Sequence, residues 1–159
     1  MTEPSAFQDH DHATCTAAAL DHARRMAEER GLRLTPVRRK ALEILLAQHQ
    51  AVGAYEVLEG LAASGFGSQP PAAYRALDFL VENGFAHRIR RLNAYAACSH
   101  PGTAHSPAFF ICENCEAVAE APAEEVREVV KAAANRIGFK VARMNVEVTG
   151  ICPACEAAT

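Results

Sequence analysis

The stretch PPAAYRALDFLVENG, residues 70–84, and the stretch FAHRIRRLNAYAAC directly after it, residues 85–98, decide the fold of the first half of this chain. In the first, apolar residues recur at helical spacing behind a pair of prolines, and an Asn-Gly pair ends the pattern, which predicts a helix over 70–82. In the second, two extended runs flank the tight Leu92-Asn93 connection, which predicts a two-stranded hairpin. A helix that leads into a basic hairpin is typical of a winged helix-turn-helix fold.

Three more helices are expected before this stretch. Residues 17–30 are rich in helix formers, and Gly31 suits the left-handed residue that ends a helix. Thr35-Pro36 offers an N-cap followed by proline at the first helical position, with apolar residues at helical spacing behind it. A short helix over 55–63, closed by a glycine-containing turn, completes the winged domain.

In this fold the helix over 70–82 is expected to read DNA, because a recognition helix follows the turn and presents its first residues to base edges. Arg75 lies near its start, where a guanidinium group is able to contact guanine through two hydrogen bonds. The hairpin carries three arginines placed to hold phosphates: Arg88, Arg90 and Arg91.

Composition supports two small domains with different charge. The chain has 159 residues, half of them hydrophobic, and a net charge of −3 that argues against indiscriminate binding to polyanions. All of this net charge falls after Cys98, whereas seven basic residues against two acidic ones lie between Arg24 and Lys40. The split predicts a front half that faces phosphates, although such a stretch also occurs on ordinary solvated faces. Because no apolar run is long enough to cross a bilayer, we expect a cytoplasmic protein.

The second half predicts a small module of mixed helix and sheet. Extended runs over 108–112 and 117–120 come first, and a helix with glutamates in its first turn then runs from Pro122 to Gly138. A final strand over 139–149 is expected to place its apolar residues on one face and Arg143, Asn145 and Glu147 on the other. A module of about fifty residues is generally stapled by a metal or dimerised.

Two cysteine pairs supply the staple. Cys112 and Cys115 form one C-x-x-C pair, and Cys152 and Cys155 form the other. Four thiolates at this spacing are the ligand set of a tetrahedral structural zinc site. Two disulfides or two redox motifs are the alternatives, but no secretory signal and no thioredoxin-like strand and helix accompany the pairs.

The predicted fold class is therefore α+β, with an N-terminal winged helix-turn-helix followed by a small α/β dimerisation domain stapled by a four-cysteine zinc site. We expect a flexible tail over 1–16, the winged DNA-binding domain over 17–98, a hinge loop over 99–107, and the dimerisation and zinc-binding domain over 108–159. The histidines and acids at 9–12, with Cys15, suit metals in composition but are assigned no site.

Several motifs together resemble the ferric uptake regulator (Fur) superfamily, and within it the branch of zinc uptake regulators. The resemblance covers roughly residues 17–156. It implies a homodimeric repressor that binds double-stranded operator DNA when loaded with zinc and controls zinc uptake genes. It rests on Arg33-Leu34-Thr35-Pro36-Val37-Arg38, on Pro70-Pro71 through Tyr74-Arg75-Ala76-Leu77-Asp78-Phe79-Leu80, on Gly84-Phe85-Ala86-His87 and on the cysteine pairs.

The resemblance also implies a second, regulatory zinc site. Its members are two imidazoles, one thiolate and one carboxylate, a plausible tetrahedral set in which soft sulfur favours zinc over iron or manganese. His100 competes with one histidine of the set, because spacing does not settle ligands in a loop. Filling of this site is expected to fix the orientation of the winged heads, while the four-cysteine site stays filled. The implied ligands are His87, Cys98, His105 and Glu120.

For contacts with DNA the resemblance implies Tyr55, Tyr74 and Arg75. The chain departs from the family pattern at Ala72-Ala73, where Thr-Val is common before Tyr-Arg, and the resemblance implies that a threonine hydroxyl able to contact phosphate is lost. The other functions considered are a Fur-family sensor of iron, manganese or peroxide, a zinc enzyme, and a zinc-stapled module for protein interaction. No His-Glu-x-x-His helix, nucleophile elbow or phosphate-cradling loop supports an enzyme.

Overall fold

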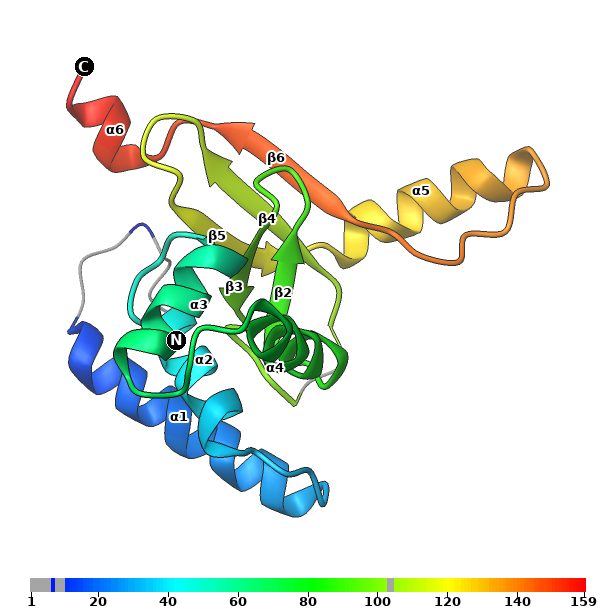
Figure 1. Ribbon diagram of the computed structural model, residues 1–159. Coiled ribbons are helices and arrows are strands. Elements are labelled where there is room, and N and C mark those ends of the chain that lie inside the picture. The colour runs from blue at the N-terminus through cyan, green and yellow to red at the C-terminus, as the bar shows by residue number, and fades with distance from the viewer. Residues whose placement is uncertain (1–6, 8–10, 103–104) are drawn as a thin grey trace.

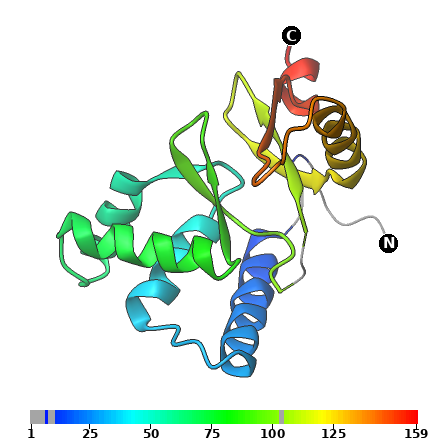
Figure 2. The ribbon, with the colours of Figure 1, turned by 90° about the vertical axis from the view of Figure 1, so that its right-hand side faces the viewer.

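The computed structural model describes residue 7 and residues 11–102 and 105–159, and it shows two modules side by side (Figures 1 and 2). The N-terminal module has four helices and a small sheet, and the C-terminal module has a second sheet and a projecting helix. Of the expected flexible tail, residues 1–6 and 8–10 lie outside the described residues. Among the residues that are described, no helix is long and apolar enough to span a membrane.

Helix α1 (His12–Glu29) begins five residues before the predicted start. Its N-cap is Asp11, whose carboxylate accepts the backbone N–H of Ala13 at 3.1 Å. The prediction missed this start because the first turn has no apolar stripe. Gly31, with φ of 65°, follows the helix end as predicted.

The other helices of the winged module confirm the predicted signals. Thr35 caps α2 (Pro36–Leu46) by accepting the N–H of Arg38, and α3 (Ala54–Ala63) and α4 (Pro70–Glu82) follow. Their apolar faces meet in one core with α1 and the start of the hairpin. The largest fully buried side chains of this core are Leu45, Leu61, Leu77, Leu80 and Phe85.

The predicted hairpin consists of β2 (Ala86–Ile89) and β3 (Ala94–Ala97), joined by a turn in which Asn93 has φ of 48°. A third strand, β1 (Val52–Gly53), pairs with β3, so the sheet order is β1-β3-β2. This strand was not predicted, because two residues carry no readable alternation. The winged helix-turn-helix architecture is confirmed.

The C-terminal sheet has the order β5-β4-β6. The central strand β4 (Pro107–Cys112) pairs antiparallel with β5 (Val118–Pro122) and parallel with β6 (Val146–Gly150). The expected strand over 139–149 is wrong in its first part. Its pairing with β4 starts at Ala108 opposite Val146, so residues before Val146 have no neighbouring strand.

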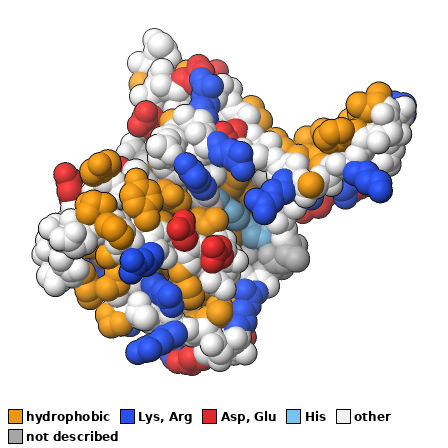
Figure 3. All heavy atoms as spheres, turned by 45° about the vertical axis from the view of Figure 1, so that its right-hand side comes forward, with side chains coloured by type: hydrophobic (Ala, Val, Ile, Leu, Met, Phe, Trp, Pro, Cys, Tyr) orange, Lys and Arg blue, Asp and Glu red, His pale blue; other side chains and the backbone are white. Residues whose placement is uncertain are grey.

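Helix α5 (Glu124–Arg136) projects away from the C-terminal sheet, and a short helix, α6 (Pro153–Ala157), lies near the end of the chain (Figure 1). Figure 3 shows hydrophobic side chains along the projecting arm. Val129 and Ile137 are 69% and 80% exposed, which is unusual for residues of an apolar stripe. A single chain leaves this face of α5 without a covering partner.

The two modules meet along the hairpin. Ile89 of β2 packs against Phe109, Ile111 and Val118 of the C-terminal sheet in a small second core. A backbone bridge between Gln50 and Ala117 continues this contact. The sheet therefore has one face against the winged module.

Candidate metal centres and nucleic-acid interface

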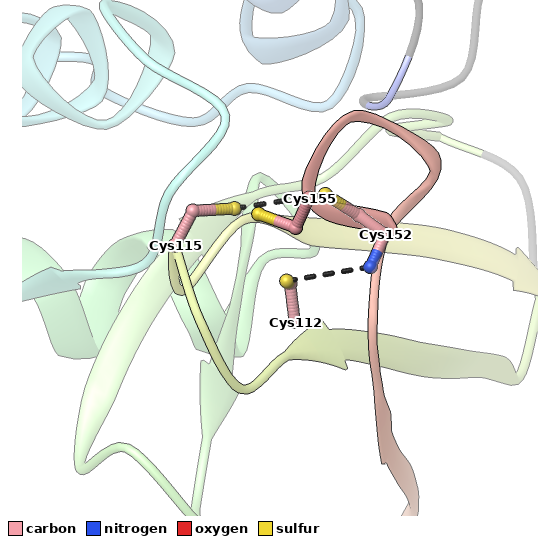
Figure 4. Close-up of side chains that lie close together, drawn as sticks. All are labelled: Cys112, Cys115, Cys152 and Cys155. Carbon is pink, nitrogen blue, oxygen red and sulfur yellow. Dashed lines mark hydrogen bonds between the residues drawn. The ribbon is translucent and has the colours of Figure 1, made fainter. Parts of the chain in front are cut away.

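The four cysteines of the two C-x-x-C pairs converge at the far end of the C-terminal sheet (Figure 4). Cys112 ends β4, Cys115 lies in the turn after it, and Cys152 and Cys155 belong to the start and the body of α6. Their sulfur atoms all lie within 4.8 Å of one another. All six cysteines of the chain are free thiols, so the disulfide alternative does not describe this structure.

The thiols are held in an environment that suits a thiolate-bound cation. The backbone N–H groups of Cys115 and Cys152 lower the pKa of Cys112 to about 6, and the N–H of Cys152 lies 3.3 Å from the Cys112 sulfur. Hydrogen bonds with Cys152 and Cys115 raise the pKa of Cys155 to about 12. Four sulfurs in one small volume fit the tetrahedral zinc set, whose positive charge would stabilise all four as thiolates.

A second cluster lies between the modules. His87 comes from β2, Cys98 follows β3, His105 lies in the loop before β4, and Glu120 belongs to β5. The ligand atoms of these four residues also lie within 4.8 Å of one another. His105 Nε2 is 2.6 Å from Glu120 Oε1, and Cys98 Sγ is 3.5 Å from His105 Nε2.

The two acidic groups of this second cluster have pKa values shifted in opposite directions. Burial opposes ionisation of Glu120, but contacts with His87, the N–H of Ser99 and His105 together lower its pKa to about 2. Burial, reinforced by the charge of Glu120, raises the pKa of Cys98 to about 12. A cation bound here would displace the Cys98 proton.

One atom of the cluster supports its assignment as a metal ligand. The Nε2 of His87 is buried and has no hydrogen-bond partner among the described residues. It lies 3.4 Å from Glu120 Oε1, without the geometry of a hydrogen bond. A cation among the four ligand atoms would satisfy this nitrogen, so two imidazoles, a thiolate and a carboxylate fit a tetrahedral zinc ion.

His100, the competing histidine, is not part of the cluster. Its ring centroid lies 6.0 Å from that of His105, while its backbone N–H donates to the Cys98 sulfur. The structure thus groups His105 with the other three. Of the N-terminal residues that were assigned no site, Asp9 and His10 lie outside the described residues, and Cys15 is exposed on α1.

The residues expected at DNA lie together on the outer face of the winged module. Tyr55 and Tyr74 are 73% and 45% exposed and line one shallow groove between α3 and α4. Arg75, next along α4, is exposed and makes no hydrogen bond or ion pair to the described residues. These three side chains are available for an external partner.

Residues 29–149 match the Ferric uptake regulator family. The chain belongs to this family. It is 37% identical to the zinc uptake regulation protein of Escherichia coli (strain K12) over 143 residues, which cover 89% of this chain and 84% of that protein. It is similar to a structure of a zinc uptake regulator complexed with zinc and DNA, with a TM-score of 0.85 and 36% identity, covering 90% of this chain and 96% of that one.

A further Fur-family comparison concerns the arrangement of the two modules. The holo structure of XcZur matches with a TM-score of 0.80, covering 88% of this chain and 98% of that one, whereas the apo structure matches with 0.52, covering 89% and 97%. Sequence identity is 38% in both cases, so the difference between the two scores is one of conformation. As a whole, this chain is more similar to the holo structure than to the apo structure.

Proposed function

We propose that this Fur-family chain is a zinc-responsive transcriptional repressor that binds operator DNA as a homodimer and controls zinc uptake genes in the cytoplasm. The observation that carries the proposal is the second cluster, which joins the two modules and contains the Cys98 thiol. The zinc uptake regulators among its relatives support the choice of metal and of target genes.

Each subunit is proposed to hold two zinc ions with different roles. The four-cysteine set draws all its ligands from one module, so its zinc stabilises the fold of that module. The set of His87, Cys98, His105 and Glu120 draws ligands from both modules, so its zinc regulates their orientation. A thiolate among these ligands favours zinc over Fe²⁺ and Mn²⁺, which distinguishes the chain from sensors of iron, manganese or peroxide.

The residues of the regulatory set act by fixing one module against the other. His87 and Cys98 belong to the hairpin of the winged module, and Glu120 belongs to the sheet of the dimerisation module. With zinc bound, these side chains share one centre and the hairpin is held on the sheet. To move the population from mostly open to mostly closed, zinc has to favour the closed form by about 5.5 kcal/mol.

In the zinc-bound homodimer, each winged module presents the same DNA-binding residues, so the dimer has two equivalent DNA-binding surfaces. The exposed apolar face of α5 is proposed as the dimer contact, so the two winged modules are related by symmetry. Each α4 then enters a major groove with Arg75 toward base edges, and Tyr55 and Tyr74 lie beside it at the backbone. The hairpin arginines add contacts to phosphate.

The test combines zinc analysis with DNA binding. Duplexes are first selected from a random library with the zinc-loaded wild type, and the winning duplex is titrated with wild type and Cys98→Ser. Bound zinc is counted in each protein. We expect two zinc ions per subunit in the wild type and one in the variant, and we expect the variant to lose zinc-dependent binding to the duplex.

Cys15→Ser is the matched control, because Cys15 is exposed on α1 and outside both clusters. It should bind two zinc ions and the selected duplex as the wild type does. Full, zinc-dependent DNA binding by Cys98→Ser would show that the regulatory set is wrongly assigned.

A further inference from the structure

One row of side chains crosses the C-terminal sheet toward the winged module. Phe109 in the central strand is paired with Glu120 of β5 on one side and with Glu147 of β6 on the other. Paired residues of neighbouring strands point to the same face of a sheet. Phe109 packs against Ile89 of the hairpin, so both carboxylates also face the winged module.

The two carboxylates have different partners. Glu120 belongs to the regulatory cluster, whereas Glu147 meets the turn of the hairpin. Glu147 Oε1 accepts the backbone N–H of Arg90 at 2.7 Å, and Oε2 accepts that of Arg91 at 3.0 Å. Asn145 donates its side-chain amide to Glu147 Oε1 at 2.8 Å and so orients the carboxylate. This contact links strand β6 to a turn more than fifty residues away in sequence.

The contact is strong for a surface position. Burial of Glu147 opposes its ionisation, but the hydrogen bonds from Asn145, Arg90 and Arg91 outweigh it and lower its pKa. Both oxygens receive backbone donors, which are fixed in direction and need no ordering of long side chains. By contrast, the Arg91 guanidinium lies 3.9 Å from Glu113, and both side chains are more than half exposed, so that pair contributes little.

We propose that Glu147 is a positioning residue for DNA binding, which anchors the hairpin turn to the dimerisation sheet and sets the rotation of the winged module. This inference rests on the proposed function. Zinc at Glu120 would hold the hairpin near one end of this row, and the bridge of Gln50 with Ala117 joins the modules outside the hairpin, so neither fixes the hairpin turn. Glu147 holds a second point two strands away, about 10 Å along the same row. Two points and the apolar contact at Phe109 between them define one orientation.

The anchor also leaves the arginines available. Because Glu147 binds the backbone of Arg90 and Arg91, it orients the turn without occupying either guanidinium group. The turn is thus fixed where its cations are needed for phosphate. Removing the carboxylate should therefore weaken DNA binding while leaving both zinc sites intact.

The test uses the zinc-loaded, full-length protein with Glu147→Ala and Glu147→Gln. Hydrogen exchange of the Arg90 and Arg91 amides is measured by NMR, bound zinc is counted, and the duplex selected by the wild type is titrated. In Glu147→Ala we expect faster exchange at both amides, two zinc ions per subunit, and DNA binding weakened about tenfold. Glu147→Gln keeps one carbonyl acceptor, so it should show a smaller loss.

Glu128→Ala is the control, because Glu128 is exposed on α5 and pairs only with Lys131 among the described residues. It should leave amide exchange and DNA affinity unchanged. Unchanged exchange in Glu147→Ala would overturn the anchor. If the amides exchange faster in Glu147→Ala but its DNA affinity equals that of the wild type, Glu147 does not position the winged module. If Glu147→Ala loses zinc or no longer dimerises, the role of Glu147 is purely structural.

Failure of the proposed function would be seen separately, in the protein without substitutions. If the wild type selects no duplex in the presence of zinc, the proposed repressor function is wrong, and so is the proposed role of Glu147 in DNA binding. The exchange rates of the two amides do not depend on DNA, so they still decide whether the anchor exists.

Discussion

The two candidate metal clusters differ in what they connect. The four-cysteine cluster joins the end of β4 to α6 within the C-terminal module, whereas the cluster around Glu120 joins the hairpin, the loop before β4 and strand β5. The first closes a module that is too small to be comfortable alone. The second ties the winged module, which has its own core, to the C-terminal sheet, beside the small core that the two modules share. We therefore propose that a metal at the first cluster would stabilise one module and that a metal at the second would orient the two modules.

The clusters also differ in how their empty states are expected to behave. Without a cation the C-terminal module loses the metal-ligand bonds that tie its sheet to α6, so emptying the four-cysteine cluster is a folding event. Loss of a cation from the second cluster would release bonds that join the two modules, and would leave the core of the winged module in place. Emptying this cluster shifts a population of conformations, which is what a sensor requires.

The largest effect is expected from breaking the four-cysteine cluster. Cys155→Ser removes one thiolate, and structural zinc sites of this kind contribute about 10 kcal/mol or more to folding. The variant should lose cooperative unfolding of the C-terminal module and elute as a monomer or an aggregate, as circular dichroism and size exclusion would show. A folded, dimeric Cys155→Ser would mean that this cluster does not stabilise the module.

A smaller effect on stability, but a large one on zinc, is expected at the second cluster. His105→Ala should weaken zinc binding at the regulatory set by about 100-fold, measured by competition with a chelator of known affinity, and should leave the fold and the other zinc ion in place. His100→Ala is the matched control in the same loop. It should change zinc affinity by less than about tenfold, because His100 lies outside the cluster of four ligand atoms. Equal losses of zinc affinity in both variants would show that His100 is also a ligand.

The two clusters were also predictable to different degrees. The four-cysteine set could be read from the sequence, because C-x-x-C spacing is local and each pair supplies two ligands from one turn. The four residues around Glu120 have no such spacing. They meet only because β2 and β5 lie on facing surfaces of two modules. Family resemblance, rather than a sequence pattern, predicted them as one set.

The same contrast holds for the fold. Helices with a cap and an apolar stripe were predicted closely, as at Thr35 and over 70–82, whereas β1 and α6 are too short to carry a period. Glu147 was expected on the polar side of its strand, and nothing local shows that this side faces the hairpin. Only the parallel pairing of β6 with β4, which joins distant residues, places it there.

A substitution at the DNA-binding surface should change DNA affinity without changing zinc binding at either cluster. Arg75→Ala is expected to weaken binding to the selected duplex about 10-fold to 100-fold, because one bidentate contact to a base is lost. Zinc content and affinity should not change, since Arg75 contacts neither cluster. Arg75→Lys keeps the charge but not the two parallel donors, so it should recover only part of the loss and should relax preference at one base pair. A variant that lost zinc as well would contradict this separation.

The smallest effect should come from the hydrogen bond that links the four-cysteine cluster to the winged module. Gln50 donates its side-chain amide to the carbonyl of Cys115 at 2.7 Å, beside the backbone bond from Val118 to His49. Gln50→Ala should lower the unfolding free energy by about 1 kcal/mol and the melting temperature by about 2–4 °C, with zinc content unchanged. Gln48→Ala, at an exposed neighbouring position, should have no effect. If Gln50→Ala also weakened DNA binding, the four-cysteine cluster would share in orienting the winged module, and the division of roles between the two clusters would be less sharp than their ligands imply.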